Sequence, residues 1–495
     1  MLSPHEICSA QIMNSSQQIP VTIARGDGIG PEIMDAVLHV LKEAGAPLDY
    51  QEIEIGEKVY LRGIPTGMEP RAWDILRKTK AFLKAPITTP QGGGFKSLNV
   101  TIRTSFNLYA NVRPCEAYAP FIQTKHPGMH LTIIRENEED LYVGLEYRQS
   151  YEGTKSIKLI SRPGSEKIIR YAFEYARKYG RKKVTCFTKD NIMKLSDGLF
   201  HKVFNEIGEQ YPEIEKEHWI VDIGAAKLAD TPELFDVIVL PNLYGDILSD
   251  VAAQISGSVG LAGSANIGDH GAMFEAIHGS APRRAGQNVA NPSGLLHASI
   301  LMLHSLNETE IAERIHNAWL CTIEEGIHTY DIFTEGTSRQ KVGTREFARA
   351  VVKNLGNTPH TLPKAKHAKQ SRLHSFPIAN KVPSEQRTCV GIDVTIFSHD
   401  STASILHTLT SHGFSSLALR MISNRGARIW PEGQPETFCI DQWRLRFMHK
   451  DQKSEATPNQ CLDIVRAVQS LGYEVVSVEM LYQYDGVPAY SSAEG

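Results

Sequence analysis

The chain has 495 residues, more than the ~100–200 residues of a typical domain, so we expect two or three domains. Apolar residues make up 41% of it and charged residues 22%, which excludes an intrinsically disordered chain. The 52 basic residues nearly balance the 56 acidic ones, so overall charge argues against a nucleic-acid-binding protein.

Targeting signals and cysteine usage narrow the class further. No apolar run reaches the ~18 residues that a membrane span needs. The polar lead-in at residues 1–18 lacks the apolar core of a signal peptide. The seven cysteines are scattered and odd in number, which argues against a disulfide framework. We therefore expect a cytoplasmic enzyme with no membrane and no nucleic-acid partner.

Short apolar runs alternate with helical repeats along the first half of the chain. A flexible N-terminus at 1–18 precedes a strand-like run at 19–24, and apolar residues recur at helical spacing over 33–44. Further strands are predicted at 81–85, 131–134, 183–187 and 235–240, and further helices at 168–176 and 245–255. This alternation predicts an α/β fold with a substantial open sheet.

The last third differs in composition. Residues 358–384 carry four lysines, one arginine and several prolines but no acid, which predicts a basic, Pro-containing linker, with an RNA-binding arm as the alternative. Residues 385–495 suggest strands at 390–397, 417–422, 437–447 and 474–481 and helices at 405–409 and 461–471. This order predicts a small α+β domain of βαββαβ type. It holds no recognisable catalytic cluster, so we interpret it as an assembly or regulatory module.

A glycine-containing turn, Gly26-Asp-Gly-Ile-Gly-Pro31, follows the first strand. The dinucleotide fingerprint GxGxxG requires a glycine where Pro31 stands, so the match fails. We interpret the segment as a tight turn before a helix rather than as a Rossmann cradle.

Three arginines, Arg103, Arg113 and Arg135, stand in neighbouring segments, and Ser97 and Asn99 precede the first of them. Three guanidinium groups close together would repel one another unless an anion lay between them. Guanidinium groups bind carboxylates in bidentate geometry, which makes a small polycarboxylate the natural ligand. The alternative is that each arginine is a surface salt-bridge partner.

Asp246 and Asp250 are spaced i,i+4 on a predicted helix, so their carboxylates share one face. A divalent cation such as Mg²⁺ or Mn²⁺ would relieve their repulsion, because hard cations prefer oxygen ligands. Alternatively, these acids favour the positive N-terminal end of the helix. Asp222, at the end of the strand-like run 219–222, is a candidate third ligand.

The segment 276–292 combines small residues with an imidazole, two arginines and an asparagine, as would suit the adenine and phosphate end of a nucleotide. The pair Arg283 and Arg284 would match a ribose 2′-phosphate; the alternative is a basic surface turn. Tyr142 and Lys189 stand at predicted loop positions, where such side chains can work as acid and base if their pKa values are tuned.

Together, the motifs at 84–103, 108–114, 134–137, 242–250 and 276–292 resemble those of the β-decarboxylating dehydrogenases, specifically isocitrate dehydrogenases of the homodimeric bacterial type. The resemblance covers about 19–357. It implies a non-Rossmann fold with a large domain (19–108 and 257–357), a small domain (109–256) and a clasp near 140–161 that interlocks two subunits. It also implies metal-dependent oxidation of isocitrate to 2-oxoglutarate and CO₂ by NADP⁺, a step of the tricarboxylic acid cycle.

The resemblance also implies roles for individual residues. Isocitrate would be bound by Ser97, Asn99, Arg103, Arg113 and Arg135. Catalysis would fall to Tyr142 and Lys189, and the metal to Asp222, Asp246 and Asp250, with Lys189 and Asp222 reaching across from the partner subunit. The cofactor would be bound by Thr89, His278, Arg283, Arg284, Asn291 and Tyr330.

Two features depart from the family pattern. NADP-using members most often have Lys-Tyr, and NAD-using members Asp-Ile, where this chain has Arg283-Arg284; two cations favour NADP. Thr334 stands where an arginine often follows, so NAD is the alternative. The segment beyond 385 resembles the extra domain of longer bacterial members and is expected to hold subunits together. The alternative functions are an isopropylmalate, homoisocitrate or tartrate-type dehydrogenase and a catalytically silent regulatory subunit.

Overall fold

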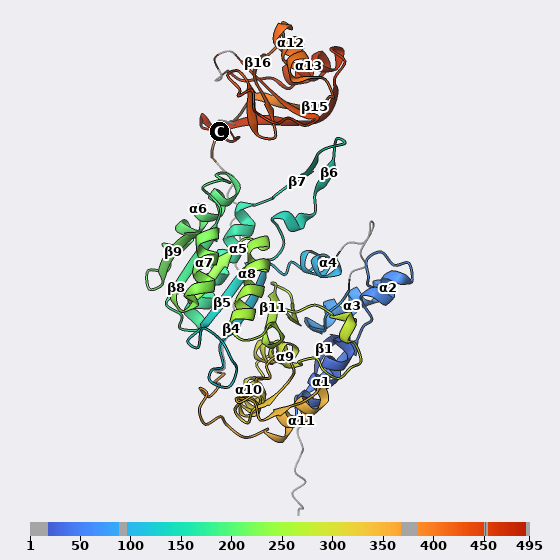
Figure 1. Cartoon of the computed structure of the whole chain (residues 1–495), viewed down its shortest axis with the longest axis vertical. Helices are drawn as coiled ribbons and strands as arrows, with labels where there is room; N and C mark the ends of the chain where they lie inside the picture. Colours follow the sequence, from blue (N-terminus) through green and yellow to red (C-terminus); the bar gives the residue numbers. More distant parts are fainter. Residues whose placement is uncertain (1–17, 89–96, 368–383, 450, 452–453, 492–495) are drawn as a thin grey trace, which may run out of the picture. The chain divides into compact units, whose positions relative to one another are not determined.

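The computed structural model describes residues 18–88, 97–367, 384–449, 451 and 454–491 (Figure 1). Residues 1–17, Thr89 and most of the predicted linker (368–383) lie outside these ranges. The chain divides into two compact units. The first comprises Met1–Glu139, Ser161–Lys189 and Phe200–Phe376, and the second comprises Asp140–Ile160, Asp190–Leu199 and Pro377–Gly495. The predicted division of the dehydrogenase region into a large and a small domain stays a prediction.

A ten-stranded sheet in the order β2-β1-β3-β12-β11-β4-β5-β10-β8-β9 organises the first unit. Its pairings are parallel except at β12–β11, β11–β4 and β4–β5. The α/β fold predicted from the sequence is confirmed. The strands are β1 (Ile19–Ala24), β2 (Leu48–Glu52), β3 (Ala81–Lys84), β4 (Ala110–Glu116), β5 (His130–Glu136), β8 (Lys183–Thr188), β9 (Glu215–Ile220), β10 (Val237–Leu240), β11 (Gly263–Ile267) and β12 (Ala272–Ala276).

Helices cover both faces of this sheet (Figure 1). The helices are α1 (Gly30–Glu43), α2 (Glu57–Leu61), α3 (Pro70–Thr79), α4 (Leu98–Ser105), α5 (Arg162–Lys178), α6 (Ser196–Gly208), α7 (Val221–Asp230), α8 (Asn242–Ile255), α9 (Ser293–Ser305), α10 (Thr309–Glu324) and α11 (Thr344–Lys353). Short 3₁₀ turns lie at η1 (Leu141–Val143), η2 (Pro232–Leu234), η3 (Val259–Leu261) and η4 (Pro282–Arg284), and β13 (Ile327–His328) pairs with β14 (Gln340–Lys341). None of the described helices is both long enough and apolar enough to cross a membrane.

Local sequence explains both ends of α1. Pro31 lies in the first turn of α1, and the chain leaves that helix at Gly45, whose φ of +72° suits glycine. The boundary predicted at Asp222 was wrong: the run 219–222 does not end a strand there. Pairing of β9 with β8 stops at Ile220, and Asp222 lies in the first turn of α7. That turn leaves its carboxylate near free backbone N–H groups, a favourable position for an acid.

The second unit contains the predicted βαββαβ domain, with strands in the order β17-β16-β18-β15-β19-β20. Its helices and strands are β15 (Arg387–Phe397), α12 (Thr402–Ser411), β16 (Ala418–Asn424), β17 (Ala427–Trp430), β18 (Gln442–Met448), α13 (Pro458–Ser470), β19 (Glu474–Tyr484) and β20 (Val487–Pro488). The strand predicted at 437–447 begins only at Gln442. Side-chain atoms of Asn424 bind both backbone groups of Ile440, which replaces ladder pairing there. The short strands β17 and β20 were not predicted.

A hairpin of β6 (Glu146–Arg148) and β7 (Thr154–Ser156) in the second unit lies within residues 140–161, where the clasp was predicted; that this clasp hairpin interlocks two subunits stays a prediction. The backbone N–H groups of Tyr151 and Glu152 both donate to Asp441 of the C-terminal domain, at 3.0 and 3.2 Å. Gln149 donates to the carbonyl oxygen of Val476 at 3.1 Å. The hairpin and the C-terminal domain therefore form one packed unit.

Candidate active site

Arg113 and Arg135 lie on one face of two antiparallel strands. Arg113 is on β4 and Arg135 on β5, and the register places Arg135 opposite Asn111. Because residues two apart on a strand share a face, Asn111, Arg113 and Arg135 point to the same side of the sheet. Both guanidinium groups belong to nearly inaccessible residues, 4% and 1% exposed. The structure brings these two predicted residues together.

The two carboxylates of α8 face these arginines. Asp246 accepts a hydrogen bond from Arg135 and lies 3.4 Å from Arg113, and Asp250 lies 3.5 Å from Arg113. Burial lowers the pKa of Arg113, an effect that Asp246 opposes. Burial also raises the pKa of Asp250, an effect that Arg113 opposes. Both acids lie beyond the first turn of α8, so the helix N-terminus does not account for them.

Arg103 is connected to Arg113 and Arg135 through residues that the sequence analysis did not identify, and together these residues form an arginine network. It donates to Glu275 of β12 at 2.9 Å, and Lys84 of β3 pairs with the other oxygen of that carboxylate at 2.7 Å. Burial would raise the pKa of Glu275, but Lys84 and Arg103 hold it well below its usual value. Two buried cations thus share one buried anion.

Two asparagines connect this triad to Arg113. Asn266 of β11 donates to Glu275 at 2.9 Å and accepts from Asn111 at 2.8 Å, and Asn111 in turn accepts from Arg113. The four missed residues are Lys84, Asn111, Asn266 and Glu275. Each is a polar residue within or at the end of a short apolar strand. A buried polar group without a partner is costly, so this position was the one sign in the sequence that the residue has a buried partner.

Ser97 and Asn99 lie at the start of α4, the helix that carries Arg103. Ser97 occupies the N-cap position, and its side chain makes no capping hydrogen bond within the described part of the chain. The side-chain oxygen of Asn99 is buried and has no partner among the described residues. Both side chains thus keep hydrogen-bonding capacity beside the arginine network. Thr89 lies outside the described residues.

Lys189 and Asp222 form a close pair. Lys189 follows β8 and donates to Asp222 at 2.8 Å. This hydrogen bond lowers the pKa of Asp222, whose side chain is 68% exposed. Tyr142 lies in η1, which belongs to the second unit. The structure therefore brings Lys189 and Asp222 together and shows an ionised carboxylate within reach of a lysine.

The loop after β12 packs against the glycine turn after β1. Ile29 donates to the carbonyl oxygen of Ser280 at 2.8 Å, and a Cβ at Gly28 would lie 2.0 Å from that oxygen. Glycine is required here by this close approach and by its φ of +59°. The interpretation of the segment as a tight turn before a helix is confirmed.

His278 and the two arginines lie along this loop. Burial lowers the pKa of His278, and its Nε2 is buried without a partner among the described residues. The guanidinium of Arg284 lies 4.4 Å from the ring centroid of Tyr330, so these two predicted residues come together. Arg283 is exposed in the same turn, η4.

Asn291 is buried, and its side chain binds neighbouring protein groups. Its amide donates to Asp331 at 3.0 Å, and its side-chain oxygen accepts from the backbone of Ser293 at 2.9 Å. Both ends of the side chain therefore have protein partners. We interpret Asn291 as a residue that holds the loop in position.

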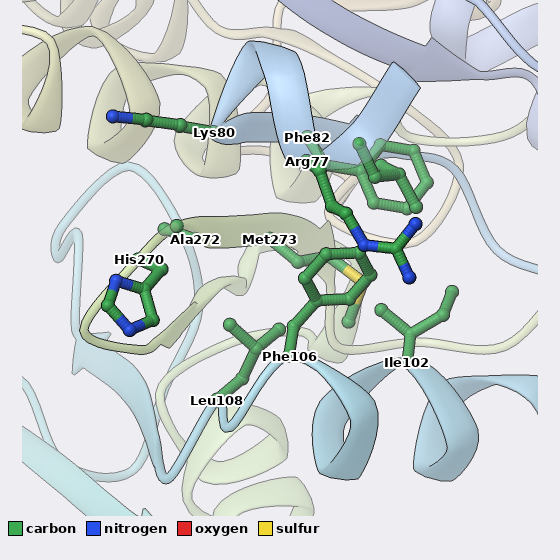
Figure 2. A pocket seen from close by; sticks show the side chains of 11 residues that line it. Arg77, Lys80, Phe82, Ile102, Phe106, Leu108, His270, Ala272 and Met273 are labelled. Carbon is green, nitrogen blue, oxygen red and sulfur yellow. The ribbon is translucent and has the colours of Figure 1, made fainter. Parts of the chain in front are cut away.

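An apolar cavity of about 100 Å³ lies on the other side of α4 (Figure 2). Arg103 of that helix faces Glu275, whereas Ile102 lines the cavity together with Phe82, Phe106 and Met273. Figure 2 shows that its polar groups are the long side chains of Arg77 and Lys80 and the ring of His270. Its mainly apolar wall does not suit a polycarboxylate, so the arginine network is the better candidate site.

Comparisons with known proteins point to one family. Residues 20–351 match the family described as isocitrate/isopropylmalate dehydrogenase, and residues 387–495 match the bacterial isocitrate dehydrogenase C-terminal domain. The chain is 53% identical to a protein of Rickettsia typhi named isocitrate dehydrogenase [NADP], over 96% of this chain and 99% of that one. A Thermus thermophilus protein of the same name is 42% identical over 96% and 95%.

Solved structures give the same result. A crystal structure of a Thermus thermophilus protein superimposes with a TM-score of 0.88 at 41% identity and covers 96% of each chain. Isocitrate dehydrogenase from Methylococcus capsulatus covers 68% of this chain and 99% of its own, with a TM-score of 0.65 at 40% identity.

Proposed function

The chain belongs to the isocitrate/isopropylmalate dehydrogenase family, and from this membership we propose that it oxidises isocitrate with NADP⁺ and releases 2-oxoglutarate and CO₂. The observation that carries the proposal is the buried arginine pair Arg113 and Arg135 facing Asp246 and Asp250. It combines binding groups for substrate carboxylates with oxygen ligands for a cation in one place.

A divalent cation fits the residues present. Asp246 and Asp250 offer carboxylate oxygens from one helix face, and their side chains are 39% and 62% exposed, so they stay accessible to an ion. Such an ion, when bound, lowers the pKa of the substrate hydroxyl and stabilises the negative charge that develops as CO₂ leaves. We propose Mg²⁺ or Mn²⁺ as the ion and Asp246, Asp250 and Asp222 as its ligands.

The arginines bind and orient the substrate. Arg103, Arg113 and Arg135 come from α4, β4 and β5, and their burial fixes their side chains before substrate arrives. Prior ordering of this kind raises the effective concentration of the reacting groups. Ser97 and Asn99 would hold a third carboxylate, and this polar pair favours isocitrate over an isopropyl-bearing relative.

Proton transfer falls to two further groups. Lys189 donates to Asp222 at 2.8 Å, so it would give one of its protons to that carboxylate as its Nζ takes the proton of the substrate hydroxyl. The Tyr142 hydroxyl would then protonate the carbon that has lost CO₂. We propose that Lys189 and Asp222 complete the site of a second subunit, so that the active form is a homodimer.

Arg283 and Arg284 would select the cofactor. Guanidinium groups bind a ribose 2′-phosphate strongly. Arg284, on the loop after β12, lies over the ring of Tyr330. Thr89, His278 and Tyr330 would complete the cofactor contacts, and Asn291 would act by supporting the loop. The relatives named isocitrate dehydrogenase [NADP] support this choice over NAD.

Steady-state kinetics test the proposal. We expect the purified full chain with MgCl₂ and NADP⁺ to turn over isocitrate with a kcat/KM at least ~100-fold above that for 3-isopropylmalate, since the lost carboxylate leaves polar groups without partners. A higher rate with 3-isopropylmalate would contradict the substrate assignment. No turnover with either substrate would favour the catalytically silent subunit.

A further inference from the structure

A second cavity lies behind the arginine network, on the opposite face of the sheet. Its volume is about 220 Å³, and it lies between α5 and α9 over β4 and β11. Val112 and Ala265 line it, whereas the next residues along each strand, Arg113 and Asn266, belong to the network on the other face. Because side chains alternate along a strand, the two sites lie back to back across the same strands.

Aromatic rings form much of the wall of this rear cavity. Tyr109, Tyr171, Tyr175 and Tyr179 line it, and successive ring centroids are 6.0, 6.5 and 4.4 Å apart. Tyr109 and Tyr171 are only 4% and 5% exposed. Neither hydroxyl has a hydrogen-bond partner among the described residues. Two nearly buried phenols thus line a cavity with hydrogen-bonding capacity left over, which a ligand oxygen would satisfy.

The charged groups of the rear cavity indicate the sign of its ligand. Lys80 and Lys178 line it together with one carboxylate, Asp269. His304 and His367 also line it, and burial lowers the pKa of both, that of His304 to about 4, so both imidazoles are neutral at pH 7. Two cations against one anion leave an excess of one positive charge, which a monoanion would balance.

We propose that the rear cavity is a binding site for a small aromatic carboxylate. Its ring would pack among the tyrosines, and its carboxylate would accept hydrogen bonds from Lys178 and from the free phenols. Aromatic walls with a few placed donors are the usual composition of a small-molecule site. Such a ligand would bind independently of isocitrate, because the sheet separates the two sites.

Phenylacetate tests this proposal on the full-length protein. Calorimetric titration is expected to give a Kd on the order of 1 mM, a typical strength for a ligand of about ten non-hydrogen atoms. Acetate, which lacks the ring, and benzyl alcohol, which lacks the charge, are expected to bind at least about fivefold more weakly. Saturating isocitrate is expected to leave the Kd for phenylacetate unchanged.

Three variants locate the binding. Lys178→Gln and Tyr171→Phe remove one donor each, and each is expected to weaken phenylacetate binding about three- to tenfold. Lys182→Gln, an exposed lysine four residues away that does not line the cavity, is the matched control and is expected to bind as the parent does. Absence of saturable binding, an equal Kd in Lys178→Gln and Lys182→Gln, or displacement by isocitrate would each overturn the proposal.

Discussion

Glu275 is the group whose charge we expect to matter most to both stability and substrate binding. Its carboxylate, 7% exposed, pairs with Lys84 at 2.7 Å and Arg103 at 2.9 Å, and the side chains of both cations are less than 10% exposed. Glu275→Gln keeps the shape of the side chain and an acceptor for Asn266 but removes the charge. It leaves two buried cations without a counter-ion, which is expected to cost about 3–5 kcal/mol.

Thermal unfolding of the full-length protein measures this cost. A loss of that size is expected to lower Tm by about 5–10 °C for a unit of this length. The KM for isocitrate should rise as well, because Arg103 loses the partner that orients it. Glu69→Gln is the control, since it breaks an exposed ion pair with Arg62 and is expected to cost less than about 1 kcal/mol. A Tm and a KM for Glu275→Gln that match those of Glu69→Gln would refute the reasoning.

The remaining predictions concern pH, cofactor choice and assembly. The pKa of Glu275 is held below its ordinary value of 4.5, so its contribution is full above that pH and is lost as the pH falls further. The Tm difference between parent and Glu275→Gln should therefore shrink from pH 7 to pH 3, and a constant difference would contradict this. Arg283→Asp is expected to weaken NADP⁺ by about 1–3 kcal/mol and to improve the relative use of NAD⁺. The exposed Arg345→Asp should leave the ratio of kcat/KM values unchanged, and equal ratios in both variants would make Arg283 a surface charge only. Deleting 385–495 removes the partners of the clasp hairpin and is expected to shift a dimer toward monomer in sedimentation experiments; an unchanged dimer would exclude the assembly role.

Local sequence pattern was sufficient to predict site residues where these residues lie on one helix or on neighbouring strands. The spacing of Asp246 and Asp250 placed both on one helix face, and the structure shows both facing Arg113. The strand containing Arg135 was predicted from its apolar run. Its neighbour β4 pairs with it and places Arg113 beside Arg135. These residues were predictable because one helix and one strand pair position them.

Contacts between strands that are far apart in the sequence could not be predicted from local pattern. Glu275 and Lys84 are directly opposite each other on β12 and β3, which are far apart in the sequence. Nothing local to either strand indicates that pairing, so the triad with Arg103 could not be predicted. The boundary at Asp222 was missed for a related reason, because the end of β9 is set by where its pairing with β8 stops.

The most direct test of the central claim is the coupling between Mg²⁺ and isocitrate in binding calorimetry. Asp246 holds both Arg113 and Arg135 in this structure, so a cation that engages Asp246 should release guanidinium groups for the substrate. We expect Mg²⁺ to tighten isocitrate binding at least ~10-fold, and isocitrate to tighten Mg²⁺ binding by the same factor. An isocitrate Kd that is the same with and without Mg²⁺ would contradict the claim that these acids and arginines form one site.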